Sequence, residues 1–201
     1  MTQDPHRSMK VPLAGALLFL SALLGAAVPT DVLAASGDGR AESGARWFRA
    51  MLAADTEIER KVDSQGTLRI YVVHTGDTDR ARSLVDALAR PDARRVSEPI
   101  RGLPVRVEVL GIEAGLQLSA GVVGGFFVAE PLRRHHLDAL VQLGVDRRAL
   151  VYSPFEGDVE KGVPGGLSIQ AQVRPYINTP SLRASQISLR PAFLKVARVF
   201  P

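Results

Sequence analysis

The stretch that decides the fold is Leu68-Arg69-Ile70-Tyr71-Val72-Val73-His74, followed by Thr75-Gly76-Asp77-Thr78-Asp79. Its first seven residues are rich in β-branched and aromatic side chains, which predicts a buried strand. The Gly-Asp-Thr-Asp run after it predicts a turn that supplies helix caps. Apolar residues then recur at helical spacing from Ala81 to Leu88, which predicts a helix that ends at Pro91. Such a strand–turn–helix unit is typical of α/β proteins.

The same alternation continues on both sides of this unit. Trp47, Phe48, Met51 and Leu52 recur at helical spacing and predict an amphipathic helix before the first strand. Further strands are predicted at 104–109, 122–128 and 149–152, and further helices at 112–119 and from Pro131 onward. Strands that alternate with helices predict a mainly parallel sheet with helices on both faces.

The pattern changes after Ser153. Residues 154–166 are rich in glycine, proline and acidic residues, which predicts a loop or a single helical turn. Residues 167–174 alternate apolar and polar for a full strand, and 175–178 continue it in extended form. A short turn or helix at 182–185 and a last helix from Pro191 to Phe200 complete the chain. The predicted fold is therefore a single α/β domain whose mainly parallel sheet is followed by a C-terminal strand plus helix.

The N-terminus has the three regions of a secretory signal. Lys10 precedes an apolar run over 11–28, and Val32 and Ala34 are small residues at the positions that a signal peptidase reads. We expect a signal peptide over 1–34, a flexible leader over 35–43 and the α/β domain over 44–201, located in the periplasm of a Gram-negative bacterium. An uncleaved membrane anchor is the alternative, because 18 apolar residues are close to the length that spans a bilayer. After cleavage we expect no stable membrane insertion.

Composition excludes several classes of function. The chain has no cysteine, so disulfides, thiolate catalysis and cysteine-bound metals are excluded. Its 25 basic and 21 acidic residues are interspersed and it has one tryptophan, which disfavours nucleic-acid binding. It contains neither a Gly-x-Ser-x-Gly elbow nor a Gly-x-x-x-x-Gly-Lys phosphate loop. We therefore expect a protein that is not an enzyme and has no cofactor.

A candidate ligand site follows the first strand. His74, Thr75 and Asp77 come at its carboxyl end, where open α/β sheets form their ligand crevice. The N-terminus of the next helix could hold an anion there. The alternative is that these residues form only a turn and a helix cap.

Other clusters of polar residues indicate no metal site. His135 and His136 are adjacent on a predicted helix and point about 100° apart, so we expect two solvent-facing side chains. Glu156, Asp158 and Glu160 could bind calcium or supply a glycosidase pair, but the spacing of a calcium loop is missing. A solvated acidic loop is the simpler interpretation.

A candidate interaction surface combines the loop 155–166 with the extended segment 174–179. Phe155 is the aromatic residue of a charged, glycine-rich loop, and Arg174, Tyr176 and Asn178 follow nearby. Tyrosine and arginine are frequent anchors of protein interfaces. We therefore expect these four residues to contact a partner.

Three segments of the final third carry a resemblance to a known family. They are Gly165-Gly166-Leu167-Ser168-Ile169, Tyr176-Ile177-Asn178 and Phe193-Leu194-Lys195-Val196-Ala197-Arg198-Val199. The chain resembles the YfiR-like family of exported bacterial proteins over roughly residues 44–200. The absence of cysteine departs from the disulfides of that family and removes redox control.

The resemblance implies a regulatory function. It implies a periplasmic repressor that binds the sensor domain of an inner-membrane diguanylate cyclase or histidine kinase, with effects on cyclic-di-GMP and biofilm formation. A homodimer is also compatible with it. The alternative from the residues alone is a periplasmic solute-binding module for a small anion at His74–Asp79.

Overall fold

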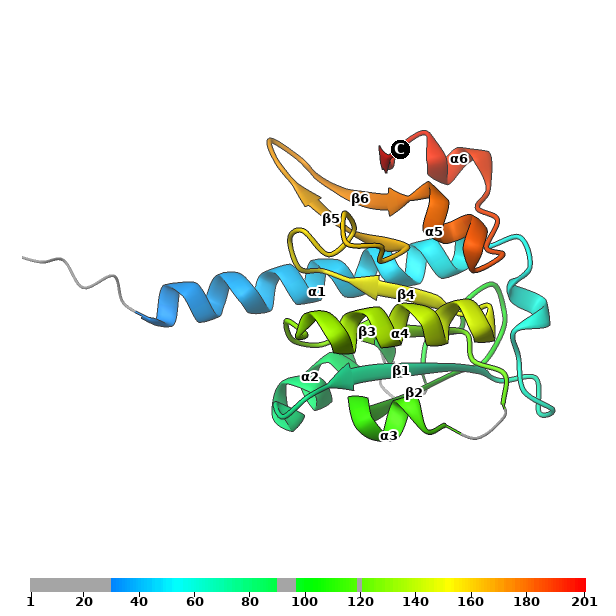
Figure 1. Ribbon diagram of the computed structural model, residues 1–201. Coiled ribbons are helices and arrows are strands. Elements are labelled where there is room, and N and C mark those ends of the chain that lie inside the picture. The colour runs from blue at the N-terminus through cyan, green and yellow to red at the C-terminus, as the bar shows by residue number, and fades with distance from the viewer. Residues whose placement is uncertain (1–29, 90–96, 119–120) are drawn as a thin grey trace, which may run out of the picture.

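A computed structural model describes residues 30–89, 97–118 and 121–201. A seven-stranded sheet runs through them in the order β2-β1-β3-β4-β5-β6-β7, with helices on both faces (Figure 1). All neighbouring strands pair in parallel except β5 and β6. The predicted class, a single α/β domain with a mainly parallel sheet, is confirmed.

The elements follow one another in the predicted alternation up to β4. The strands are β1 (Leu68–His74), β2 (Val105–Gly111), β3 (Gly125–Val128), β4 (Leu150–Ser153), β5 (Gly165–Ile169), β6 (Val173–Asn178) and β7 (Arg198–Phe200). The helices are α1 (Thr30–Ala54), η1 (Ile58–Arg60), α2 (Thr78–Ala89), α3 (Ile112–Leu116), α4 (Arg134–Arg147), α5 (Thr179–Ala184) and α6 (Pro191–Leu194).

Two apolar layers hold the helices to the sheet. On one face, Phe48 of α1 packs against Phe127 and Tyr152, each at a ring-centroid distance of 5.6 Å. On the other face, Leu137 and Leu140 of α4 belong to a buried cluster with strand residues that point away from α1. Because successive strand residues face opposite sides, the central strands are buried on both faces.

The first helix begins earlier than the sequence predicts. Residues 35–43, expected as a flexible leader, lie within α1. Ala41 at the end of this segment is buried against the core, as is Ala45 just after it. A Cβ atom on Gly44 would lie 2.8 Å from Cβ of Pro154, so α1 approaches the sheet closely there. The flexible-leader prediction is therefore wrong for this segment.

The C-terminal third differs from the sequence prediction in two places. The single strand expected over 167–174 is a hairpin, in which β5 and β6 pair antiparallel through a connection at Gln170–Gln172. The last helix ends at Leu194, and Arg198–Phe200 instead form β7, which pairs in parallel with β6. Helical spacing of apolar residues was misleading here because the sheet offers residues 198–200 a strand to pair with.

Most of the predicted signal peptide lies outside the described residues, and residues 30–34 form the beginning of α1. Within the described ranges, none of the helices combines the length and the apolar character needed to cross a bilayer.

Candidate functional site

The carboxyl ends of β1 and β3 lie side by side, because β1 stands between β2 and β3 in the sheet. After β1 the chain forms β2 on one side of β1, and it then crosses to form β3 and β4 on the other side of β1. Open α/β sheets bind ligands at such a switch point, outside the carboxyl ends of the strands. The predicted ligand residues His74, Thr75 and Asp77 are therefore at the expected place in the fold.

A carboxylate of the protein itself occupies this switch point. Oε1 of Glu130, two residues beyond β3, accepts hydrogen bonds from the amides of Thr75 at 2.5 Å, Gly76 at 2.9 Å and Asp77 at 3.3 Å. The Thr75 hydroxyl donates a further hydrogen bond at 2.8 Å. Successive backbone amides in a turn form an anion-binding concavity, and α2 adds the positive end of its dipole. The turn is thus an anion site filled from within the chain.

The charge of Glu130 is stabilised there. Partial burial raises the pKa of its carboxyl, but the hydrogen bonds from Thr75, Gly76 and Asp77 outweigh this effect. The pKa falls from an ordinary value of 4.5 to about 2. Glu130 is therefore ionised throughout the physiological range and ties the loop after β3 to the loop after β1.

The other two predicted ligand residues differ from each other. Oδ1 of Asp77 accepts a hydrogen bond from the amide of Arg80 at 3.0 Å, so Asp77 caps α2. Nδ1 of His74 is buried and has no hydrogen-bond partner among the described residues. A hollow of about 530 Å³ beside the turn is lined by Glu42, Asp77, Asp79 and Arg80, among others. Three carboxylates and one guanidinium make this hollow unfavourable for a free anion.

A second group of predicted residues meets where the β4–β5 loop lies against β6. Phe155 of the β4–β5 loop and Tyr176 of β6 both line a hollow of about 100 Å³, although 21 positions separate them. Glu160 of the loop and Arg198 of β7 line it as well. We call Phe155, Glu160, Ser168, Tyr176 and Arg198 the loop–sheet surface.

Arg198 and Tyr176 form the centre of this surface. The Arg198 guanidinium lies 4.6 Å from the centroid of the Tyr176 ring, and its Nη1 donates to Ser168 Oγ at 3.1 Å. Burial raises the pKa of the Tyr176 phenol, the Glu160 carboxylate raises it further, and Arg198 partly offsets both effects. Tyr176 therefore stays a neutral hydroxyl between a carboxylate and a guanidinium. Arg198 was not among the predicted contact residues.

Arg174 and Asn178 do not belong to the loop–sheet surface. Arg174 is exposed near the hairpin and binds Gln172 Oε1 through Nε at 3.1 Å and Nη2 at 2.7 Å. Asn178 is buried, donates to the Val159 carbonyl at 2.8 Å and accepts from the Ser181 amide at 3.0 Å. It caps α5 and anchors the loop, so its side chain is not presented to a partner.

The acidic loop does not gather Glu156, Asp158 and Glu160 into one cluster. Asp158 is buried and accepts hydrogen bonds from Ser153 Oγ at 2.6 Å and Lys161 Nζ at 3.1 Å. It therefore fixes the loop to β4, whereas Glu156 and Glu160 are exposed. Across residues 30–89, 97–118 and 121–201, no three histidine or acidic side chains are grouped as a metal site would need.

The adjacent histidines differ from each other. His135 is exposed as expected, but the His136 side chain is only 16% exposed, and its Nε2 lies 2.9 Å from Oε1 of Glu113. The centroids of the two imidazole rings are 4.0 Å apart. His136 thus connects α4 to α3, and the prediction that it points to solvent is wrong.

Comparison with known proteins adds little to this description. No protein-family model matches the chain, and no curated protein matches it in sequence. Among solved structures, it is similar to an ABC domain in complex with L-Trp from Streptococcus pneumonia, with a TM-score of 0.46 and 12% identity. The alignment covers 75% of this chain, which spans 60% of the length of that one. A likeness at this level supports no inference about function.

Proposed function

We propose that this chain is a periplasmic regulatory protein that binds the sensor domain of an inner-membrane diguanylate cyclase or histidine kinase and modulates its output. The proposal rests on one observation. The three segments that carry the resemblance to the YfiR-like family lie in β5, in β6, and in α6 and β7, and these strands are neighbours in the sheet. The residues of the resemblance thus form one continuous part of the molecule.

The loop–sheet surface lies on this part and has the chemistry of an interface. Phe155 is half-buried, Glu160 and Arg198 are exposed, and Tyr176 lies between them. Ile169 and Val173 at the nearby hairpin are 46% and 42% exposed. Aromatic and arginine side chains beside exposed apolar residues are typical of contact surfaces.

Site-specific cross-linking tests this proposal. A photoreactive phenylalanine analogue replaces Phe155 in one variant and, in a control, Leu116 of α3, which is 36% exposed and lies near β2, at the other end of the strand order. We expect Phe155 alone to cross-link to a membrane protein with an extracytoplasmic sensor and a cyclase or kinase output. Identical products from both positions, or none from Phe155, would contradict the proposal. A cross-link to a second copy of this chain would favour a homodimer through this surface.

A charge reversal gives an independent measurement. Glu160→Lys places a cation beside Arg198 and should weaken repression, so cellular cyclic-di-GMP or kinase output should change. Asp86→Lys on the exposed side of α2 alters the net charge equally and serves as the control. Equal effects of both variants would contradict the proposal that the loop–sheet surface contacts the partner.

A second candidate function is binding of a small anion at the Thr75–Asp77 turn. It is favoured by the four hydrogen bonds that converge on one carboxylate oxygen there. Since Glu130 fills the turn, a free anion must replace this side chain. Acetate should therefore raise the melting temperature of Glu130→Ala strongly and, at higher concentration, that of the unaltered protein as well. Absence of any rescue would exclude this candidate.

A further inference from the structure

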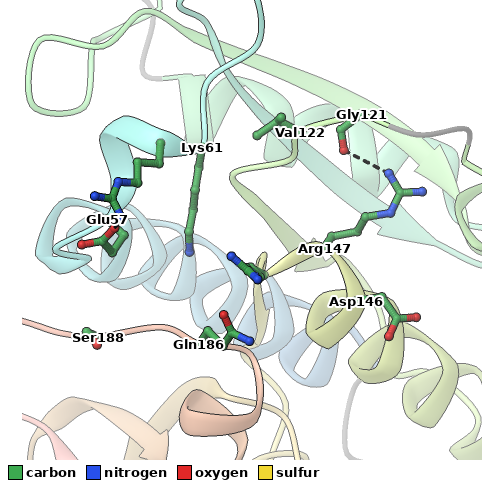
Figure 2. A pocket seen from close by; sticks show the side chains of 10 residues that line it. Glu57, Lys61, Gly121, Val122, Asp146, Arg147, Gln186 and Ser188 are labelled. Atoms are coloured by element: carbon green, nitrogen blue, oxygen red, sulfur yellow. Dashed lines mark hydrogen bonds and ion pairs between the residues drawn. The ribbon is translucent and has the colours of Figure 1, made fainter.

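A hollow of about 1100 Å³ lies at the edge of the sheet where the parallel strands begin, opposite the edge that carries the Thr75–Asp77 turn. Its walls come from η1, from the C-terminal end of α4, and from the segment between α5 and α6. Figure 2 shows Lys61, Arg147 and Gln186 arranged around it from these three directions. Small-molecule sites occupy about 300–1,000 Å³, so the hollow can hold a molecule of metabolite size.

Basic side chains predominate on its walls. Four cations (Arg60, Lys61, Arg147, Arg148) and two carboxylates (Glu57, Asp146) line it. Arg60 pairs with Glu57, and Lys61 pairs with the buried carboxylate of Asp55 at 2.6 Å. Arg147 and Arg148 stand at the end of α4 beside Asp146, and the four cations and two carboxylates of the walls leave a net charge of +2.

Arg147 is held in one orientation. Its Nη1 donates to the carbonyl of Gly121 at 3.0 Å, drawn as a dashed line in Figure 2, and its Nη2 donates to that of Leu118 at 2.7 Å. These bonds fix the planar guanidinium before any ligand arrives. A fixed guanidinium loses little conformational entropy on binding and suits carboxylate or phosphate oxygens.

Three other donors at the hollow are uncommitted. The side chains of Arg148, Gln186 and Ser188 form no hydrogen bond or ion pair with any residue in the part of the chain that the structure describes. Arg148 and Gln186 are exposed and take left-handed backbone conformations, with φ of 52° and 53°.

The end of α4 does not repel an anion as a bare helix terminus would. The amides of Arg148 and Ala149 donate to the carbonyls of Val145 and Gly144 at 3.1 and 2.9 Å. These bonds satisfy the last carbonyls of the helix. The guanidinium groups of Arg147 and Arg148 then complement the negative end of its dipole.

We propose that this hollow binds a compact organic polyanion, of the tricarboxylate or oligophosphate class. Its donors stand on three separate walls, so a small molecule with several acceptor oxygens reaches them together. An acidic protein segment would contact fewer of them, because it would have to enter a concave site from one side. The proposal is independent of the loop–sheet surface, which lies on other elements.

Calorimetric titration of the full chain with citrate and with ATP tests the proposal. Arg148→Gln should raise the Kd of the bound probe about tenfold or more, because it removes an ionic hydrogen bond from the site. Arg133→Gln, an exposed arginine at the other end of α4, changes the net charge equally and should leave the Kd within about twofold. Gln186→Ala is a second, uncharged variant that should also weaken binding.

Two outcomes would overturn the proposal. One is that neither citrate nor ATP binds more tightly than chloride at equal ionic strength. The other is that Arg148→Gln and Arg133→Gln lose equal affinity, which would indicate attraction to the overall charge only. Binding of an oligoglutamate peptide without binding of either probe would assign the hollow to a protein partner. The melting temperature of each variant without ligand establishes that it is folded.

Discussion

Glu130→Gln tests whether the anion inside the Thr75–Asp77 turn stabilises the fold. The carboxyl pKa falls from 4.5 to about 2, which corresponds to about 3 kcal/mol at about 1.4 kcal/mol per unit. Because Glu130 is only half-buried, solvent screening reduces this to about 1–2 kcal/mol. Glutamine keeps an acceptor oxygen but loses the charge. We expect the free energy of unfolding at pH 7 to fall by that amount and the melting temperature by about 2–8 °C.

The lowered pKa of Glu130 also fixes how the free energy of unfolding changes with pH. The folded pKa lies below the unfolded one, so the stabilisation is complete above about pH 5 and is lost as the pH falls toward 2. The stability difference between the two proteins should therefore shrink to less than half by about pH 3. Urea unfolding at pH 7, 5, 4 and 3 measures it, with the exposed Glu42→Gln as control. A difference that is equal at pH 7 and pH 3, or absent at pH 7, would refute the reasoning.

Two further substitutions test buried contacts. Lys61→Met leaves the carboxylate of Asp55, whose side chain is 1% exposed, without its cation, and should cost about 3–5 kcal/mol in chemical unfolding. Arg60→Met at the neighbouring exposed pair should cost less than about 1 kcal/mol, and equal losses would contradict the burial argument. Gly166→Ala would place a Cβ atom 2.6 Å from the carbonyl oxygen of Ser153, so overpacking should cost about 1–3 kcal/mol. An unchanged melting temperature for this variant would show that β4 and β5 can separate without cost.

The sequence predicts the parallel half of the sheet well, because there each element carries one clear periodicity. Leu68–His74 has the bounds of β1, since an uninterrupted apolar run between turn residues fits only a strand buried on both faces. Residues 35–43 show where the same reasoning fails. Small residues signal flexibility in a loop, yet Ala41 of this segment is buried in α1 against the core. Composition alone does not distinguish a flexible loop from a helix that packs closely against the core.

The C-terminal third was harder to predict because its turn lacks the usual markers. The connection Gln170-Ala171-Gln172 contains no glycine, proline or asparagine, so a continuous strand was the natural prediction. Phe200 lies on the apolar face of the expected helix, but Arg198–Phe200 instead form hydrogen bonds with β6, and the helix ends at Leu194. Short elements of this kind depend on tertiary partners more than on local propensity.

The main residue that sequence reasoning missed is Glu130. It follows the strand Gly125–Val128 as Thr75 follows β1, and parallel strands bring their carboxyl ends to the same edge. The sequence therefore shows a carboxylate just after a predicted strand. Placing it at the Thr75–Asp77 turn requires knowing that β3 borders β1 on the side away from β2. Strand order is a tertiary property that the alternation of elements does not fix.

The position of Glu130 bears on where this molecule can bind anything. In an open α/β sheet the switch point is the usual ligand site because its amides need an acceptor. Here the neighbouring strand provides that acceptor, and the carboxylates beside it disfavour a second anion. Arg148, which is uncommitted, lies at the other edge of the sheet, and Arg198 and the exposed apolar residues Ile169 and Val173 lie on β5 to β7. Binding is therefore best sought at the hollow beside Arg148 and at the loop–sheet surface. Separate variants test each of these two sites.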